Sequence, residues 1–173
     1  MNLMQPFQDP TTVGRYAKDT PRKVPGFSDL HLMTTVLLRE SAPETAEILG
    51  IDDVRPGPFD GATCLLTLHF LDRDQRLRTL RALRQRLKPS ARLVVAHHTA
   101  PNRGSVERWL ARSVAFASES IDFALASASA ATMAERLPIL SAEEDEAMLH
   151  DAGFTDVAMF YAAFSFRGWV ATA

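Results

Sequence analysis

Four places in the sequence carry residue types that could do chemistry. His69 follows an apolar run, and His97-His98 stands at the end of a second apolar run. An acidic pair, Asp52-Asp53, precedes both runs, and His31 lies further upstream. Imidazole groups can transfer protons near neutral pH or bind metal ions, and carboxylates can accept hydrogen bonds. These residues are the candidates for a general base, a ligand contact or a metal site.

The histidine pair argues against a metal site. Adjacent residues of a strand point to opposite faces of the sheet, so His97 and His98 cannot both bind one metal ion from that strand. A zinc site would need a further ligand at a suitable spacing, and none is evident in the sequence. We therefore expect no metal. One histidine should pack in the core or against a helix, and the other, His98, should face a pocket and contact the substrate.

The elements that must position these residues form a strand, a helix and a second strand. Ala62–Leu68 is a short apolar run typical of a strand buried on both faces. A helix follows between Asp72 and Lys88, and Arg92–Thr99 is the next apolar run. Two buried strands joined by one amphipathic helix predict a right-handed crossover in a parallel sheet.

The helix of this unit has local signals at both ends. Asp72 is a favourable N-cap residue, and Gln75 is placed three positions later to complete a capping box. The proline of Lys88-Pro89 ends the helix, because proline disfavours helical geometry in the residue before it. Leucines at steps of three and four give the helix one apolar face. They are Leu77, Leu80, Leu83 and Leu87.

In an open α/β sheet, ligands bind at the carboxyl ends of the parallel strands. Thr67, Leu68 and His69 end the first predicted strand, so we expect them to line a pocket. His98 ends the second strand and belongs to the same edge. His31, early in a helix expected over 29–39 with Ser28 as its N-cap, is a further candidate for a substrate contact.

The remaining elements follow from caps, turn residues and apolar runs. They are a short helix over 10–17, helices over 106–119 and 122–137, a helix over 142–151 capped by Ser141, and an antiparallel pair of strands over 154–163 and 165–171. We expect one domain with four parts. These are residues 1–50 with the leading helices and a first strand, 58–101 with the crossover, 102–152 with helices, and 153–173 with the strand pair.

Length and composition are typical of one soluble globular domain. The chain has 173 residues, of which 46% are hydrophobic, enough for a substantial core. No apolar run approaches the roughly 20 residues that a membrane span needs, and no signal peptide is visible at the start. The single cysteine, Cys64, excludes an internal disulfide and is expected to be an inert core thiol. We expect a cytoplasmic protein.

Charge is unevenly distributed along the chain. Residues 72–112 hold eleven Arg and Lys against three Asp and Glu, whereas residues 113–173 hold two against nine. Nucleic-acid binding would need a basic face with aromatic residues that stack on bases, and this block has no aromatic residue before Trp109. We therefore interpret the basic block as a solvated helix face paired with the acidic end of the chain, and expect no nucleic-acid partner.

These segments together resemble class I S-adenosylmethionine-dependent methyltransferases. The order G-P-F-D-G-A, apolar strand, L-H-F-L-D, helix and L-K-P-x-x-R-L-V-V is similar to the fourth strand, fourth helix and fifth strand of that family. The similarity extends downstream through A-E-E-D-E-A-M-L-H-D-A-G-F-T-D-V and upstream to V-P-G-F-S-D-L-H-L-M-T-T-V-L-L-R-E. The family usually has L-K-P-G-G before the fifth strand, where this chain has Leu87-Lys88-Pro89-Ser90-Ala91.

The resemblance implies a fold, a cofactor and a set of contacts. The fold would be a truncated doubly wound, Rossmann-like α/β sheet with parallel strands 4 and 5, a C-terminal antiparallel pair and helices on both faces. S-adenosylmethionine would be contacted by Thr67, Leu68 and His69, with Asp52 or Asp53 near the adenine amine, although a solvated loop is an equal interpretation of the two aspartates. The methyl acceptor would be a small molecule, contacted by His98 and His31.

One part of the family pattern is missing from the sequence. A glycine-rich loop should follow the first strand and place backbone amides against the cofactor. Gly50 is the only glycine between Gly26 and Gly57, and no G-x-G occurs in the chain. The sequence passes from the start of strand one to the end of strand three, without roughly 50 residues at about 30 per crossover unit.

This gap leaves two hypotheses open. The chain is a methyltransferase-family protein impaired in cofactor binding, or it is a non-catalytic relative acting as a dimeric or partner-binding module. Without strands 1–3, strand four becomes an edge, which invites pairing with another chain. We therefore expect a remnant strand within 45–49 capping that edge, a homodimer, or poor solubility.

Overall fold

The computed structural model describes residues 19–49, 57–101, 104–118 and 121–173. These ranges form a mixed α/β fold built on one five-stranded sheet with the spatial order β1-β2-β3-β5-β4. The strands are β1 (Ile48–Leu49), β2 (Phe59–Leu65), β3 (Leu87–His98), β4 (Thr155–Ala163) and β5 (Phe166–Thr172). β1, β2 and β3 are parallel, while β5 runs antiparallel to both β3 and β4.

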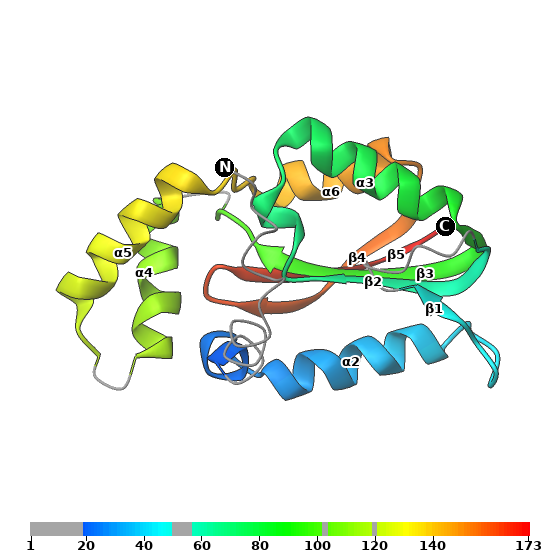
Figure 1. Cartoon of the computed structure of the whole chain (residues 1–173), viewed down its shortest axis with the longest axis horizontal. Coiled ribbons are helices and arrows are strands. Elements are labelled where there is room, and N and C mark those ends of the chain that lie inside the picture. The colour runs from blue at the N-terminus through cyan, green and yellow to red at the C-terminus, as the bar shows by residue number, and fades with distance from the viewer. Residues whose placement is uncertain (1–18, 50–56, 102–103, 119–120) are drawn as a thin grey trace, which may run out of the picture.

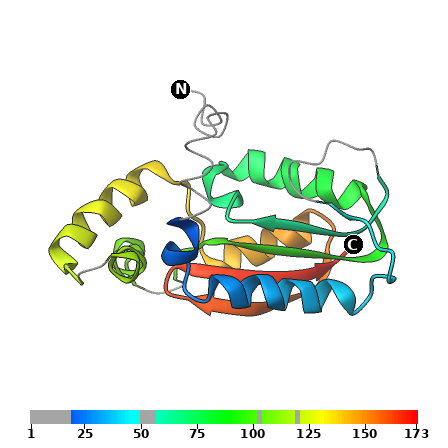
Figure 2. The same cartoon turned by 60° about the horizontal axis from the view of Figure 1, so that its bottom comes forward.

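Helices cover both faces of the sheet and one of its ends (Figure 1, Figure 2). α3 and α6 lie on one face and α2 lies on the other, whereas α4 and α5 form a hairpin beyond the end of the sheet where β3 finishes. The bounds are α2 (Phe27–Arg39), α3 (Arg73–Gln85), α4 (Val106–Ala117), α5 (Phe123–Arg136) and α6 (Ala142–Asp151), with a 3-10 turn η2 (Leu68–Phe70). None of the described helices is long and apolar enough to cross a membrane.

The strand–helix–strand unit forms where the sequence predicts it, with shifted boundaries. α3 begins after Asp72, and Asp72 and Gln75 make both bonds of the capping box. The helix ends at Gln85, and β3 begins at Leu87 instead of Arg92. The reason is that the backbone around Leu87 pairs with Phe59 at the start of β2, so these residues join the sheet.

β2 also begins and ends three residues earlier than predicted. Phe59 pairs with the start of β3, which extends the strand backwards. At the other end, Leu66 adopts a positive φ of 59°, which turns the chain out of the strand. Leu68, predicted to end the strand, therefore lies in η2, where the apolar run continues as a tight turn. Hydrophobicity alone did not distinguish the strand from the turn.

The edge of β2 is capped by β1, which is the first of the three predicted outcomes for this edge. Ile48 pairs with Gly61 and Leu49 with Ala62, both in parallel. Gly61 makes this approach possible, because a Cβ at that position would lie 2.9 Å from side-chain methyl groups of both Ile48 and Leu38. β1 and α2 therefore pack directly on the backbone of β2.

Substituting Gly61 should loosen this packing. We expect Gly61→Val to lower the free energy of unfolding by about 1–3 kcal/mol, the usual cost of overfilling a packed site, with a smaller loss for Gly61→Ala. Urea unfolding followed by circular dichroism measures both. A Gly61→Val protein as stable as the wild type would contradict the close packing of β1 and α2 on β2.

The main core lies between the sheet and the α3–α6 layer, and a smaller one lies under α2. Trp169 of β5 is completely buried in the main core, and its Nε1 donates to Glu146 Oε1 at 2.9 Å. Cys64 is buried in the main core, as predicted. One local prediction was wrong: α2 starts after Gly26, at φ 64°, rather than after Ser28.

The basic helix α3 contacts the acidic end of the chain, as the charge distribution suggests. The contacts are Arg73 Nη1 to Glu144 Oε1 at 3.1 Å, Arg81 Nη2 to the Asp151 carbonyl at 3.3 Å, and Arg84 Nε to the Gly153 carbonyl at 3.3 Å. For one arginine of the basic block, the interpretation as part of a solvated helix face is wrong. Arg76 is only 1% exposed, because it points from α3 into the layer shared with α6.

Candidate functional site

Buried polar side chains gather at the carboxyl end of β3 and the elements around it. β3 contributes its last two residues, His97 and His98, followed by Thr99. The side chains that meet them from other elements are His69 of η2, Arg76 of α3, Ser113 of α4, Asp145 of α6 and Ser165 in the turn before β5. We call this set the polar cluster. It has two halves, one on each face of the sheet.

The first half is an ion pair buried between α3, α6 and β3. Arg76 Nη1 lies 2.5 Å from Asp145 Oδ1, and both side chains are almost completely buried. Arg76 Nη2 also donates to the Pro138 carbonyl at 2.9 Å, and Thr99 Oγ1 donates to Asp145 Oδ2 at 3.0 Å. Arg76 Nε has no hydrogen-bond partner among the described residues. The hydrogen bonds with Pro138 and Thr99 therefore hold the ion pair in place.

His97 closes this half of the polar cluster. Its Nε2 lies 3.8 Å from Asp145 Oδ1, and its Nδ1 lies 3.0 Å from the His98 carbonyl. Because a carbonyl only accepts, Nδ1 carries the proton. Burial lowers the pKa of His97, while Asp145 partly opposes this shift. The ring also lies beside Trp169, with centroids 5.6 Å apart. His97 is thus the histidine packed against a helix layer.

The second half is a chain of hydroxyl groups on the opposite face. His98 Nδ1 lies 2.8 Å from Ser165 Oγ, which in turn lies 2.7 Å from Ser113 Oγ. The His98 ring stacks on Phe166 at 4.0 Å and meets the His69 ring edge-on at 4.8 Å. This chain ties α4 to the end of β3 and to the turn between β4 and β5.

Both histidines of this half are neutral near pH 7. Burial lowers the pKa of His98 to about 4, with the charge of nearby His97 as a further cause. Burial also lowers the pKa of His69 well below its ordinary value, and His98 and His97 add to the shift. The His98 amide donates to His69 Nδ1 at 3.5 Å, which requires that nitrogen to be unprotonated. Neither ring is poised to accept a proton at neutral pH.

The structure brings some of the predicted site residues together and leaves others apart. His69 and His98 are in contact. Thr67 stands at the start of η2 and donates to the Leu65 carbonyl, whereas Leu68 is part of the main core. His31 is exposed on α2 and contacts only Phe27 among described aromatic rings. Asp52 and Asp53 lie outside the described residues.

His98 is 8% exposed. The pocket predicted at its side chain is filled by Phe166, Ser165 and His69, whose rings and hydroxyl occupy the space around the imidazole. The adjacent pair does point to opposite faces, as predicted, with His97 toward Asp145 and His98 toward Ser165.

Sequence analysis missed Arg76, Asp145, Ser113 and Ser165 as members of the cluster. For two of them, the helical spacing of the apolar residues already indicated a buried position. Arg76 stands four residues before Leu80 on the buried face of α3, and Asp145 stands three residues before Met148 on the buried face of α6. A charged residue inside an apolar stripe needs a partner. Ser113 and Ser165 had no such signal.

The cluster as it stands is suited to holding elements together. Within the described ranges, no group of three or more His, Cys, Asp or Glu residues is arranged to hold a metal ion. The hydroxyl and imidazole groups are buried and hydrogen-bonded to one another, so they are closed to a ligand in this structure.

No family model matches the sequence, and no curated protein matches it either. Several solved structures do resemble the fold. One is the S-adenosylmethionine-dependent methyltransferase SibL in its apo form, 18% identical, with a TM-score of 0.49 over 70% of this chain and 33% of that one. Another is a putative O-methyltransferase from Nostoc punctiforme, 17% identical, with a TM-score of 0.48 over 71% and 34%.

A third similar structure is the pyocyanin biosynthetic protein PhzM, 21% identical, with a TM-score of 0.47 over 70% of this chain and 32% of that one. A structure described as a possible exported protein from Bordetella parapertussis is 23% identical, with a TM-score of 0.48 over 69% and 40%. The chain spans about a third of the length of the first methyltransferase structures that it matches.

Proposed function

We propose that this chain is a methyltransferase-family protein whose ancestral activity is S-adenosylmethionine-dependent methyl transfer to a small molecule. We further propose that the chain itself binds the cofactor weakly or not at all. The observation that carries the family assignment is the order of the sheet. Three parallel strands are followed by a hairpin whose last strand inserts antiparallel beside β3. This order equals 1-4-5-7-6 of the class I sheet 3-2-1-4-5-7-6, with L-K-P at the start of β3.

The connection between β1 and β2 supports the proposed loss of cofactor binding. β1 ends at Leu49 and β2 begins at Phe59. Two further strands and their helices need about 30 residues for each crossover unit, so they cannot fit in this connection. The glycine-rich loop that cradles the cofactor belongs to the absent part, and no G-x-G replaces it.

The described residues around the expected cofactor position fit this group poorly. The cofactor would need an open surface at the carboxyl end of β2, with backbone amides and polar side chains directed into it. Instead, Leu68 is 1% exposed within the core, and the His69 ring packs against Phe70 and His98.

Calorimetric titration with S-adenosylhomocysteine tests this proposal. We expect the purified, mass-verified chain to give no saturable heat at micromolar ligand, while circular dichroism shows that it is folded. A complete class I methyltransferase, titrated with the same stock, is the control for the ligand. Micromolar binding would contradict the proposal, because it would require a pocket rebuilt from the remaining elements.

The alternative is a non-catalytic module that binds a partner or a second copy. Among the described residues, the β1 ladder pairs with Gly61 and Ala62 alone and covers less than half of β2. A partly covered edge can add a strand from another chain. Light scattering on the titrated sample distinguishes the two hypotheses. A dimer without cofactor binding favours the module. A monomer without cofactor binding contradicts a module that works as a dimer.

A further inference from the structure

The hairpin of α4 and α5 has an apolar core of its own, apart from the cores of the sheet. The two helices pack through small apolar residues, chiefly alanines, around Leu110. None of the residues of this core belongs to a strand, and Figure 1 shows the hairpin projecting beyond the end of the sheet. The hairpin therefore depends on α4 alone to cover the apolar surface of α5.

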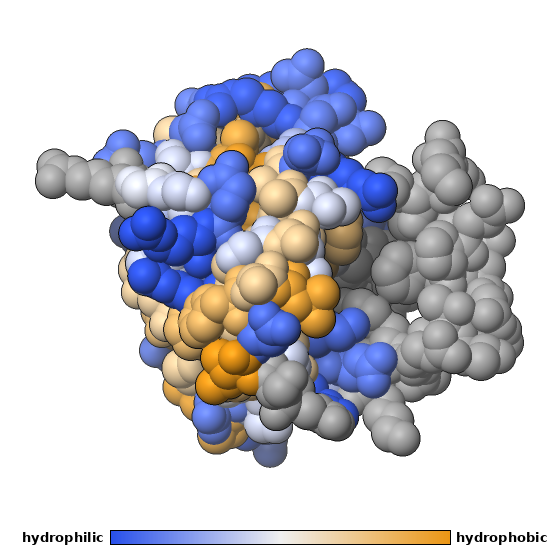
Figure 3. All heavy atoms as spheres, turned by 90° about the vertical axis from the view of Figure 1, so that its left-hand side faces the viewer, coloured by the Kyte–Doolittle hydropathy of each residue, from blue (hydrophilic) through white to orange (hydrophobic). Residues whose placement is uncertain are grey.

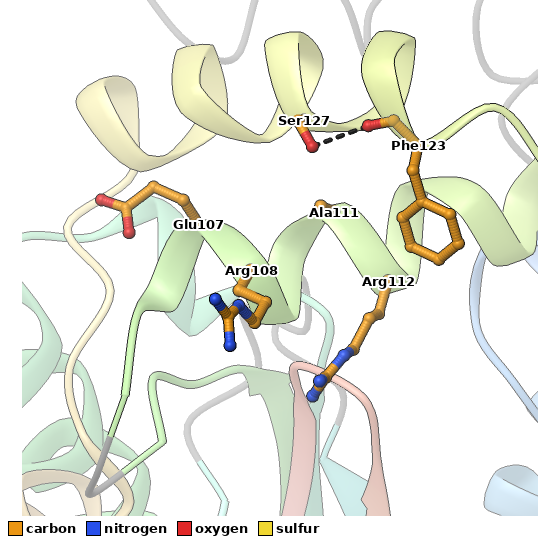
Figure 4. Close-up of a pocket in the computed structure, with 6 residues that line it drawn as sticks. All are labelled: Glu107, Arg108, Ala111, Arg112, Phe123 and Ser127. Carbon is orange, nitrogen blue, oxygen red and sulfur yellow. Dashed lines mark hydrogen bonds between the residues drawn. The ribbon is translucent and has the colours of Figure 1, made fainter.

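The contact between the two helices is incomplete. A cavity of about 570 Å³ lies along it, whereas the interior of a domain is close-packed. Figure 4 shows that the charged side chains at this cavity come from α4, and that Arg108 and Arg112 point away from α5. The side chains that α5 contributes are Phe123 and Ser127, and Phe123 is 56% exposed. Packing on α4 thus leaves apolar surface of α5 in solvent.

The outer face of α5, directed away from α4, is uncharged over about three turns. Between Phe123 and Ala134 the helix has no charged residue, and the buried Ala126 and Ala130 define the side that packs on α4. The opposite side consists of exposed residues at helical spacing, which are Ala124, Leu125, Ala128, Ala131 and Thr132. A helix that is apolar all round is normally buried, so this outer face is expected to be covered by a partner.

Large apolar side chains are exposed near the start of the same helix. Leu125 is 65% exposed, and Ile121, in the turn before α5, is 76% exposed. With Phe116 and Phe123 they make up four of the nine large apolar side chains that are exposed in the described ranges. Figure 3, which views this end of the molecule, shows hydrophobic residues gathered over it. Single exposed apolar side chains are ordinary, whereas a contiguous group marks an interaction surface.

The charges at the two ends of α5 suit an antiparallel copy of the same helix. Asp122 caps the first turn, and Arg136 stands in the last turn. Neither forms an ion pair within the described ranges. In an antiparallel pair about a two-fold axis, Asp122 of each copy lies near Arg136 of the other, and the helix dipoles run in opposite directions. Glu135, the remaining charge at this end, stays at the solvated rim of such a pair.

We propose that the outer face of α5 binds a second copy of this chain through an antiparallel α5–α5 contact. With the two-fold axis beside Ala128, in the middle of the face, Leu125 of each copy packs against Ala128 and Thr132 of the other. The small side chains allow the two helices to approach closely. Because a helix of 14 residues is only about 21 Å long, the contact is small and the dimer is expected to be weak.

This contact lies away from the partly covered edge of β2. Figure 1 shows α5 and β1 at opposite ends of the molecule. The inference depends on the surface of one helix, so it holds whether or not the chain binds S-adenosylmethionine. It also gives the dimeric module of the alternative hypothesis a specific interface.

Sedimentation equilibrium of the purified chain between about 5 and about 200 μM tests the proposal, since weak interfaces have micromolar dissociation constants. We expect a reversible equilibrium between monomer and dimer. Leu125→Lys should raise the dissociation constant about tenfold or more, because it places a charge in an apolar contact. Leu32→Lys is the matched control, at a leucine of α2 that is 64% exposed, and it should leave the dissociation constant unchanged.

Opposite charges in the middle of the face test the two-fold arrangement. Ala128→Lys and Ala128→Glu should each weaken the dimer when studied alone, because like charges then meet at the axis. An equimolar mixture of the two variants should associate more strongly than either alone, since opposite charges meet in the mixed dimer. Circular dichroism of each variant checks that the helices are intact.

Three results would overturn the proposal. They are a wild-type chain that stays monomeric at about 200 μM, a dimer that Leu125→Lys leaves as strong as the wild type, and a mixture of the Ala128 variants that associates no better than each alone. A dimer that Leu32→Lys dissociates would also contradict it, by placing the interface on α2. None of these measurements uses S-adenosylhomocysteine, so failure here is separable from failure of the proposed function.

Discussion

Replacing Asp145 by asparagine is expected to lower the free energy of unfolding by about 3–5 kcal/mol. The substitution leaves the guanidinium of Arg76 charged and 1% exposed, without the carboxylate 2.5 Å away. Removing one member of a buried pair is costly because the remaining charge keeps its desolvation penalty and loses its partner. Urea unfolding at neutral pH, followed by circular dichroism, measures the loss.

The adjacent residue supplies a matched control. Glu144 forms an exposed pair with Arg73, and the side chains are 48% and 54% exposed. Glu144→Gln keeps the capping box with Ser141, because glutamine serves equally at that position. Exposed pairs contribute about 0–1 kcal/mol, so this variant should be nearly as stable as the wild type. If Asp145→Asn and Glu144→Gln were equally stable, the buried pair would not hold α3 to α6.

A double substitution tests the cause. Arg76→Met with Asp145→Leu removes both charges and fills a similar volume with apolar atoms. Because the attraction between buried charges roughly offsets their desolvation, this protein should recover most of the stability that Asp145→Asn loses. A double variant as unstable as the single one would locate the loss in packing instead of charge.

The free energy of unfolding is expected to fall by about 3 kcal/mol as pH drops from about 6.5 to about 4, because of His98 alone. In the folded protein His98 stays neutral down to a pKa of about 4, whereas its ordinary value is 6.5. Between these two pH values, His98 is therefore protonated in the unfolded chain and neutral in the folded chain. The stabilisation is present above pH 6.5 and is lost progressively below it.

The other two histidines of the polar cluster act in the same direction. Burial lowers the pKa of both His69 and His97, so the unfolded chain also gains their protons first. The carboxyl groups with lowered pKa, Asp60, Glu107 and Glu144, have ordinary pKa values of 3.8 or 4.5 and act only at the acid end of this range. We therefore attribute the fall in the free energy of unfolding between pH 6.5 and 5 to the three buried histidines.

Urea unfolding at several pH values between 7 and 4 measures this dependence. His98→Gln should flatten the slope, since one of the three buried titrating groups is removed. His31→Gln, at an exposed position of α2, should keep the slope of the wild type. A free energy of unfolding that stayed constant from pH 7 to 5 would contradict the buried, neutral state of these rings.

Local sequence signals determined where most elements lie. Asp72 with Gln75 and Ser141 with Glu144 start α3 and α6 through bonds between residues three positions apart, and such bonds depend little on the rest of the fold. The parallel pairing of β2 and β3 follows from the helix between them, because a short loop cannot join parallel strands. The absence of any G-x-G pattern is likewise visible in the sequence itself.

Only the tertiary structure decided which polar residues meet. Arg76 and Asp145 are 69 positions apart, and Ser113 and Ser165 are 52 apart. Their contacts arise from the packing of α3 on α6 and of α4 on the turn before β5, and no local pattern encodes that packing. The same holds for the end of β2 at Leu66, where a positive φ turns an apolar run that periodicity assigns to the strand. Spacing along the chain indicates elements, whereas the environment of a buried charge is set by the residues that pack around it from distant segments.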